Sequence, residues 1–235
     1  METTPFDALL SAGVRNFVFL GEAGCGKSEL ALNLARLLAG RGGLPVHFFD
    51  LDMTKPLFRS RDRAAALEGM GVQVHFEEQF MDAPTLTGGV SRLLRDPEVL
   101  TVLDVGGDYI GARSVGGYAP LLNRADTAVL YVINPFRPWS MTLEHIDKVL
   151  GETLGVSHLR VEGLHMVGNP NLGQETELAD VLAGEETLLE LVGPYKPVEV
   201  LCVREDLAAA AAERAVTPVL PLKLYLTYPW EDDLP

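Results

Sequence analysis

The chain of 235 residues lacks most features of secreted and membrane-spanning proteins. Its two cysteines, Cys25 and Cys202, cannot make a disulfide framework, and neither lies in a CxxC or CxC pair. No cluster of Cys and His predicts a zinc or iron–sulfur site. No apolar run approaches the length that crosses a bilayer, and residues 1–7 lack the basic region of a secretory signal. We therefore expect a cytoplasmic protein with no membrane partner.

Basic residues are also scarce. The chain has 19 Lys and Arg against 33 Asp and Glu, which gives a formal net charge of −14. Because a nucleic-acid-binding surface needs clustered Lys and Arg to neutralise phosphates, we expect no nucleic-acid partner. The acidity serves solubility or, alternatively, favours a basic protein partner.

Short apolar runs alternate with longer amphipathic stretches along the whole chain. Helical patterns follow the first run as far as Gly40 and recur at about 59–68, 141–154, 175–192 and 205–214. The expected strands cover residues 16–20, 46–49, 72–76, 100–103, 128–133, 164–167 and 198–203. Mostly apolar strands separated by helices predict an α/β protein with a three-layer α/β/α fold and a mainly parallel central sheet. We expect one domain over residues 1–225 and an acidic C-terminal tail over 226–235.

The most informative motif is GxxxxGKS, which lies between the first expected strand and a leucine-striped helix, as a phosphate-binding loop requires. The glycines would let successive backbone N–H groups point at phosphates, at the positive end of the helix dipole. Lys27 would reach the β- and γ-phosphates, and the Ser28 hydroxyl would bind Mg²⁺. The motif predicts a P-loop NTPase that binds ATP, or alternatively GTP, with Mg²⁺. The candidate residues here are Gly21, Glu22, Ala23, Gly24, Cys25, Gly26, Lys27, Ser28 and the following Glu29.

Aspartates follow two of the expected strands, at the end of the sheet where the phosphate loop would also lie. Asp50 and Asp52 close the second strand on alternate residues, and Asp104 closes the fourth. Carboxylates there can hold Mg²⁺ or orient an attacking water, although Asp50 and Asp52 also suit a simple turn. A hydrophobic strand ending in Asp104 has the form of a Walker B motif, so Ser28, Asp50 and Asp104 are the candidate metal ligands.

Asp104 also begins the pattern D-x-x-G, which ends at Gly107. In such a pattern the glycine N–H can sense the γ-phosphate and move on hydrolysis. The next residue, Asp108, is a switch residue or an ordinary loop residue.

Together these motifs resemble the MinD/ParA-type branch of the SIMIBI class of P-loop ATPases. The resemblance implies that Asp52 orients the hydrolytic water as a catalytic residue beside Lys27, and that Asp50 supports the metal site. It implies that Asn169 holds adenine and that residues 204–206 border the base. The segments that carry it are Gly21–Ser28, Asp50–Asp52, Asp104–Gly107 and Asn169-Pro170; the base-side candidates are therefore Asn169, Pro170 and Arg204.

One residue departs from the family pattern. The family has a Lys two residues before the central Gly of its loop, which reaches the partner's nucleotide across a dimer, and this chain has Glu22 there. A carboxylate beside phosphates would repel them. Either hydrolysis proceeds without that lysine, or Lys55, Arg59 or Arg61 substitutes, with Lys55 the better placed. A homodimer remains an open expectation.

The base and the biological task are inferred more indirectly. A guanine site would need Asn-Lys-x-Asp, whereas the chain has Asn169–Leu172, so we expect ATP rather than GTP. The leading hypothesis is an ATPase switch that acts on an unknown protein partner in an accessory or maturation role. The alternatives are a small-molecule P-loop kinase and a nucleotide sensor without turnover. Residues 136–139 form a partner or effector surface, or simply a packed loop.

Overall fold

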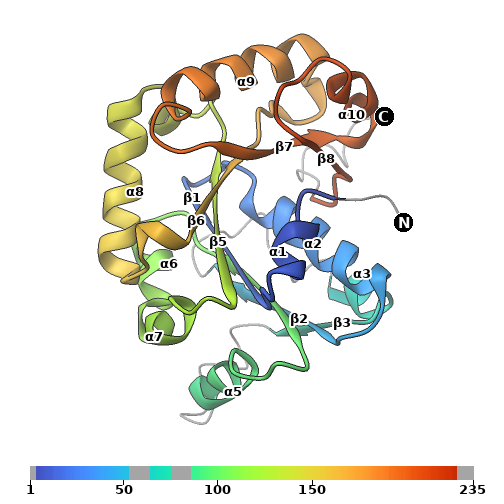
Figure 1. Cartoon of the computed structure of the whole chain (residues 1–235), viewed down its shortest axis with the longest axis vertical. Helices are drawn as coiled ribbons and strands as arrows, with labels where there is room; N and C mark the ends of the chain where they lie inside the picture. Colours follow the sequence, from blue (N-terminus) through green and yellow to red (C-terminus); the bar gives the residue numbers. More distant parts are fainter. Residues whose placement is uncertain (1–3, 53–63, 76–85, 227–235) are drawn as a thin grey trace, which may run out of the picture.

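A computed structural model describes residues 4–52, 64–75 and 86–226 of the chain (Figure 1). Its eight strands form one sheet, in the order β3-β2-β4-β1-β5-β6-β7-β8, and every neighbouring pair is parallel. All eight carboxyl ends therefore point to the same edge of the sheet. The strands are β1 (Asn16–Gly21), β2 (Val46–Leu51), β3 (Val72–His75), β4 (Leu100–Val105), β5 (Thr127–Ile133), β6 (Leu164–Gly168), β7 (Val198–Arg204) and β8 (Val219–Leu222).

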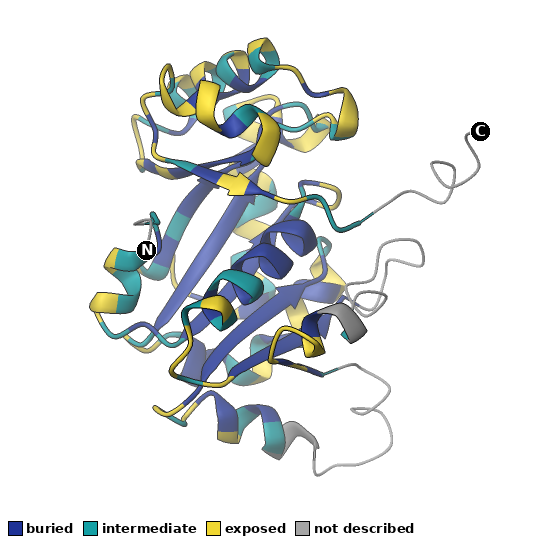
Figure 2. Cartoon of the chain, turned by 90° about the vertical axis from the view of Figure 1, so that its right-hand side faces the viewer, coloured by how far each residue is buried: buried dark blue, intermediate teal, exposed yellow. Residues whose placement is uncertain are grey.

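Helices cover both faces of this sheet, as the side view shows (Figure 2). One face is covered by α1 (Asp7–Ser11), α2 (Lys27–Arg41) and α3 (Ala64–Glu68). The other carries α5 (Leu86–Leu93), α6 (Tyr109–Ser114), α7 (Ala119–Leu122), α8 (Leu143–Ser157), α9 (Leu178–Leu191) and α10 (Glu205–Ala212). Short 3₁₀ turns η2 (Gly116–Tyr118), η3 (Pro138–Ser140), η4 (Val161–Gly163) and η5 (Gly173–Glu175) lie between these elements. This is the three-layer α/β/α arrangement that the alternating pattern predicts.

The seven expected strands are confirmed, and β8 is a strand that the pattern did not predict. Its sequence is Val-Leu-Pro-Leu, with Pro221 inside it and Pro218 just before it. Proline cannot donate to a strand ladder and is confined to edges. Because of these prolines the pattern did not indicate a strand here, and the structure places this strand at the outer edge of the sheet beside β7.

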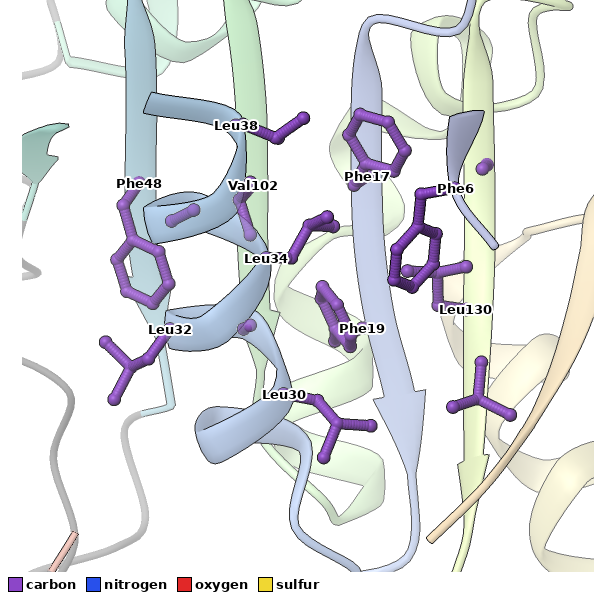
Figure 3. Packing of buried hydrophobic residues seen from close by; sticks show 14 of the residues in the cluster. Phe6, Phe17, Phe19, Leu30, Leu32, Leu34, Leu38, Phe48, Val102 and Leu130 are labelled. Carbon is purple, nitrogen blue, oxygen red and sulfur yellow. The ribbon is translucent and has the colours of Figure 1, made fainter. Parts of the chain in front are cut away.

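The packing of α2 on the sheet determines where the acidic side chains point. Leu34 of α2 projects toward Phe17 and Phe19 of β1, and Phe48 and Val102 lie on the same face of the sheet (Figure 3). Because side chains alternate along a strand, the residues two positions further on point to that face as well. These are Asp50 and Asp104, which oppose each other in the β2–β4 register.

The residues that the structure describes include no helix long and apolar enough to cross a membrane.

Candidate phosphate-binding site

The loop between β1 and α2 has a backbone that requires glycine. Gly21, Gly24 and Gly26 have φ angles of 141°, 78° and 99°, in the region that side chains disfavour. Space is also lacking: a Cβ on Gly21 would lie 2.3 Å from the Val132 carbonyl oxygen, and one on Gly26 would lie 2.2 Å from Asn169 Nδ2. The glycine positions of the motif are therefore dictated by local geometry.

Lys27 lies inside this loop and is fully buried. Its Nζ donates to the carbonyl oxygens of Gly21, at 3.0 Å, and Glu22, at 2.8 Å. These bonds hold the Lys27 ammonium inside the loop, so that the loop backbone surrounds a positive charge. An ammonium at this position would attract an anion bound above the loop.

The amide groups of the loop fit such an anion. Helix α2 begins with no side-chain cap at Gly26. Within the described part of the chain, the N–H groups of Gly24 and Gly26 donate no hydrogen bond. Unsatisfied N–H groups at the positive end of a helix form an anion site, and phosphate oxygens would satisfy them.

Three carboxylates are buried at the same edge of the sheet. Asp50, Asp52 and Asp104 are each at most 3% exposed. Asp50 Oδ1 accepts a hydrogen bond from the Asp52 backbone N–H at 3.1 Å, which fixes the turn after β2. Asp50 and Asp104 face the N-terminal end of α2, where Ser28 lies. The structure thus brings together the residues that the strand-end pattern nominated.

The donor set suits Mg²⁺ rather than a transition metal. Ser28, Asp50 and Asp104 offer only oxygen atoms, which are the ligands of hard cations. Among the described residues, no three His, Cys, Asp or Glu side chains are grouped to hold a metal by themselves. In phosphate sites Mg²⁺ is bound by one or two carboxylates, phosphate oxygens and water.

The loop after β4 lies directly against the phosphate loop. A Cβ on Gly107 would lie 2.5 Å from Ala23 Cα and 2.7 Å from Lys27 Nζ. The loop is held by Asp108, whose side chain caps α6 by accepting from the Gly111 N–H at 2.7 Å. Asp108 is thus a helix cap, and the D-x-x-G segment has no room for a side chain at its glycine.

Of the residues predicted to read the base, Asn169 lies closest to the phosphate loop. It is buried, and its Nδ2 donates to the Cys25 carbonyl oxygen at 2.7 Å. Its Oδ1 is buried without a hydrogen-bond partner in the described part of the chain. The neighbouring Pro170 packs against Gly184 of α9, where a Cβ would lie 2.4 Å from the proline ring.

Arg204 ends β7 and ties two loops together. Its Nε donates to Asp206, and its NH1 donates to the Gln174 carbonyl oxygen at 2.6 Å. The pairing with Asp206 raises the pKa of the guanidinium and lowers that of the carboxyl, mainly through their side-chain hydrogen bonds. Arg204 therefore braces the turn at Gly173–Glu175.

The carboxylate of Glu22 does not turn into the phosphate cradle. It is buried, and it accepts from the Trp139 N–H at 3.1 Å and from the Ser140 hydroxyl at 2.7 Å. Both donors belong to η3, beyond the end of β5. The repulsion expected from a carboxylate in this loop is thus reduced by two hydrogen bonds that direct it sideways.

Glu29 also points away from the loop. Its two carboxylate oxygens accept from the backbone N–H groups of Tyr225, at 2.5 Å, and Leu226, at 3.0 Å. Three cations could substitute for the missing loop lysine on sequence grounds. They are Lys55, Arg59 and Arg61, and all three lie outside the described residues.

Sequence reasoning missed one residue that orders this region. Asn134 is buried after β5; its Nδ2 donates to the Asn171 carbonyl oxygen at 2.7 Å, and its Oδ1 accepts from the Phe136 N–H at 3.1 Å. It joins the loop after β5 to the loop after β6. A signal was present: Asn134-Pro135 after one strand repeats Asn169-Pro170 after the next.

A cavity of about 440 Å³ opens beside the phosphate loop. It lies between the loop and α8, and its lining includes Ala23, Gly107, Trp139 and Lys148. The Lys148 ammonium lies 5.3 Å from the centre of the Trp139 ring, within cation–π range. A small molecule or a partner's side chain in this cavity would contact both loops of the site.

No protein-family model and no curated protein matches this chain. Among solved structures, it is similar to chloroplast FtsY from Physcomitrella patens, with 16% identity and a TM-score of 0.51; the match covers 80% of this chain and 58% of that one. It also matches the signal recognition particle receptor FtsY from Elizabethkingia anophelis in complex with GDP (16% identity, TM-score 0.48, 81% and 57% covered). A third match is a nucleotide-binding protein in complex with ADP from Archaeoglobus fulgidus (22%, 0.43, 80% and 83%).

The likeness to the Physcomitrella protein, at 16% identity, is evidence of the fold. The chain spans between half and two thirds of the length of the two FtsY chains. With the GxxxxGKS loop between β1 and α2 and an all-parallel sheet, the fold is that of the P-loop NTPases. The fold-class prediction is thereby confirmed.

Proposed function

We propose that the chain is a Mg²⁺-dependent ATP-binding protein of the SIMIBI class that hydrolyses ATP and acts as a nucleotide-driven switch. One observation carries the proposal: Gly107 lies so close to the phosphate loop that an added carbon would meet the Ala23 backbone and the Lys27 ammonium. A γ-phosphate held by Lys27 would lie beside the loop after β4. Its loss on hydrolysis would release that loop, as in other phosphate-sensing switches.

Each polar residue has a distinct role in this proposal. Lys27 and the loop amides bind the β- and γ-phosphates, whose negative charge they offset. Ser28, Asp50 and Asp104 would hold Mg²⁺, which supplies charge neutralisation at the phosphates when bound. Asp52 accepts a hydrogen bond from the attacking water and orients it.

ATP is proposed rather than GTP. The buried Asn169 Oδ1 has no partner among the described residues, and an acceptor beside a free amide hydrogen suits the adenine amino group and its neighbouring ring nitrogen. Pro170 and Arg204 lie on the same side of the loop and would border the base. Arg204 would do so through its position on the rim, since its guanidinium is occupied by Asp206 and Gln174.

The proposed output is a change of affinity for a protein partner, in an accessory or maturation role in the cytoplasm. The acidic charge argues against DNA cargo, which leaves a protein as the target. A homodimer in the ATP state is a second possible readout of the same switch, and its formation would make turnover depend on protein concentration.

The test is ATP and GTP hydrolysis with Mg²⁺ at several protein concentrations, beside Lys27→Ala and Asp52→Ala. We expect ATP turnover in the parent chain, loss of binding in Lys27→Ala, and binding without turnover in Asp52→Ala. Activity that survives in Lys27→Ala would indicate a contaminant. Failure of the parent chain to bind either nucleotide would overturn the proposal.

A small-molecule kinase is the second candidate, and the cavity beside Ala23 and Gly107 is the observation that favours it. An acceptor bound there would lie next to the terminal phosphate. Phosphate release without any added acceptor excludes this role as the main activity. Tight Mg²⁺·ATP binding with no release would instead support a kinase awaiting its acceptor or a sensor without turnover.

A further inference from the structure

The Arg137 side chain lies over the phosphate loop, and among the described residues it has no hydrogen-bond or ion-pair partner. A Cβ on Gly24 would lie 3.8 Å from Arg137 Nε and 3.9 Å from Arg137 Cζ, so the guanidinium covers the tip of the loop. Its Nε is buried and makes no hydrogen bond within the described part of the chain. No ion pair of Arg137 with a described carboxylate is found either. Arg137 as a whole is partly buried, and a buried guanidinium N–H without an acceptor favours an anion beside it.

The segment that carries Arg137 is fixed at both of its ends. On the β5 side, the Arg137 N–H donates to the Asn134 carbonyl oxygen at 3.0 Å, and Asn134 is itself bonded to Asn171. On the other side, Trp139 and Ser140 donate to the Glu22 carboxylate, which belongs to the phosphate loop. The segment is therefore held to the loop after β6 on one side of Arg137 and to the phosphate loop on the other.

We propose that Arg137 binds the nucleotide phosphates from within the same chain, and that Glu22 is the positioning residue that holds it there. The proposal rests on the proposed function, because it needs a nucleotide in the phosphate loop. The guanidinium offers several N–H donors in a plane that matches phosphate oxygens. Its positive charge would add to that of Lys27, on the opposite side of the loop tip.

The proposal gives Glu22 a use that a carboxylate in a phosphate loop otherwise lacks. The Glu22 carboxylate accepts two hydrogen bonds from η3, away from the phosphate-binding amides. The positive charge that faces those amides would come from Arg137. Glu22 and Arg137 would act together, because the residues of η3 that Glu22 binds follow Arg137 directly in the chain. Lys55, Arg59 and Arg61 are then not required to supply this charge.

The first experiment compares Arg137→Gln and Arg137→Lys with the parent chain by calorimetric titration of Mg²⁺·ATP and of Mg²⁺·ADP. Removing one charge-assisted contact should weaken binding about 10- to 100-fold in Arg137→Gln. Arg137→Lys keeps the charge and should recover part of the loss. The matched control is Arg160→Gln, an exposed arginine near the opposite edge of the sheet, which should bind within about twofold of the parent.

The second experiment tests the positioning role with Glu22→Gln and Glu22→Ala. A glutamine can accept from the Trp139 N–H and donate to the Ser140 hydroxyl, so Glu22→Gln should bind Mg²⁺·ATP about as well as the parent. Glu22→Ala loses both bonds and should weaken binding toward the level of Arg137→Gln. In a variant that combines Glu22→Ala with Arg137→Gln, the two losses of affinity should not add, because both changes remove the contact between Arg137 and the phosphates.

The outcomes separate this proposal from the one on which it rests. Parent-like affinity in Arg137→Gln, with binding abolished in Lys27→Ala, would overturn the role of Arg137 and leave the nucleotide site standing. Equal losses in Arg137→Gln and Arg137→Lys, with lowered melting temperatures in both, would show a packing role and also overturn it. Absence of nucleotide binding in the parent chain would remove the proposed function itself.

Discussion

Gly107 shows how much of the site depends on the absence of one side chain. An alanine there would place its Cβ 2.5 Å from Ala23 Cα, so either the loop after β4 or the phosphate loop must move. Neither can move freely, since Lys27 is bonded to one loop and Asp108 caps α6 at the end of the other. The close spacing between the two loops therefore depends on residue 107 being glycine.

We predict that Gly107→Ala lowers the affinity for Mg²⁺·ATP by at least about tenfold and destabilises the fold by about 1 to 3 kcal/mol, as overpacking does elsewhere. Titration with nucleotide and urea unfolding measure the two effects. Gly155→Ala is the matched control, because this exposed glycine of α8 has open space around its Cβ. That variant should gain about 0.5 to 1 kcal/mol and bind normally; normal binding in Gly107→Ala as well would contradict the tight contact.

The sequence predicts which residues lie near the phosphate loop better than the directions in which their side chains point. Residues at strand ends and in the glycine loop gather as expected, because parallel strands bring their carboxyl ends to one edge. The motif could not show that Glu22 turns toward η3, nor that Arg137 covers Gly24. Both depend on contacts between residues more than a hundred positions apart, as in the bond from Trp139 to Glu22 with its separation of 117 residues.

At the scale of elements, β2 and β3 are joined by a pair of histidines as well as by their ladder. His47 Nδ1 and His75 Nε2 lie 2.9 Å apart, and the two rings stack. Burial lowers the pKa of His75 to about 4, with a further contribution from His47, and burial also lowers that of His47. The hydrogen bond needs at least one neutral ring, so the pair favours the uncharged state.

This pair predicts a loss of stability in mild acid. Because the folded-state pKa lies below the ordinary value of 6.5, the unfolded chain binds more protons between pH 6.5 and about 4. The contribution of the neutral histidine pair to the free energy of unfolding is complete above pH 6.5, and it is lost as the pH falls from 6.5 to about 4. Between pH 7 and pH 5 we expect a loss on the order of 1 to 2 kcal/mol in the free energy of unfolding.

Urea unfolding at a series of pH values measures this loss. A His75→Gln variant should show a flatter dependence of the unfolding free energy on pH. His158→Asn serves as the control, because His158 is exposed and Asn tolerates its left-handed backbone at the end of α8. An unchanged slope in His75→Gln would show that other groups set the acid sensitivity.

Another link joins α2 to the segment after β8. Glu29 accepts from Tyr225 and Leu226, and Asn33 exchanges two bonds with the Lys223 backbone at 2.8 and 2.9 Å. We predict that Glu29→Ala destabilises the fold by about 1 to 3 kcal/mol, since it leaves two backbone donors unpaired. Glu186→Ala, on the exposed face of α9, should change stability by less than about 0.5 kcal/mol. Equal effects in chemical unfolding would deny Glu29 this role.

The elements that the sequence did not predict are short or contain breakers. β8 has a proline inside it, α6 and α7 are 6 and 4 residues long, and α5 contains two glycines. Such segments have too few residues to show a period of 3.6 or 2, and tertiary contacts decide their form. Longer elements such as α2 and α9, with 15 and 14 residues, carry a clear pattern.

At the scale of the whole molecule, the proposed ligand should act as a stabiliser. A nucleotide that binds only the folded chain adds about 2.7 kcal/mol at a free concentration of 100 Kd. For a domain of this size we expect the melting temperature to rise by about 5 to 10 °C with Mg²⁺·ATP. Chelation of the metal should shrink the shift, and Lys27→Ala should abolish it. A shift that survives in Lys27→Ala would place the ligand elsewhere.

The position of β1 in the middle of the sheet has a consequence for how the protein is made. The phosphate loop leaves the ribosome well before its long-range partners: its contact from Asn169 to Cys25 spans 144 residues, and the bonds from Tyr225 and Leu226 to Glu29 span 196 and 197. A nascent chain arrested before these residues emerge would hold an open sheet with exposed apolar edges. Nucleotide capture should then begin only late in synthesis, and the growing chain should depend on chaperones until that moment.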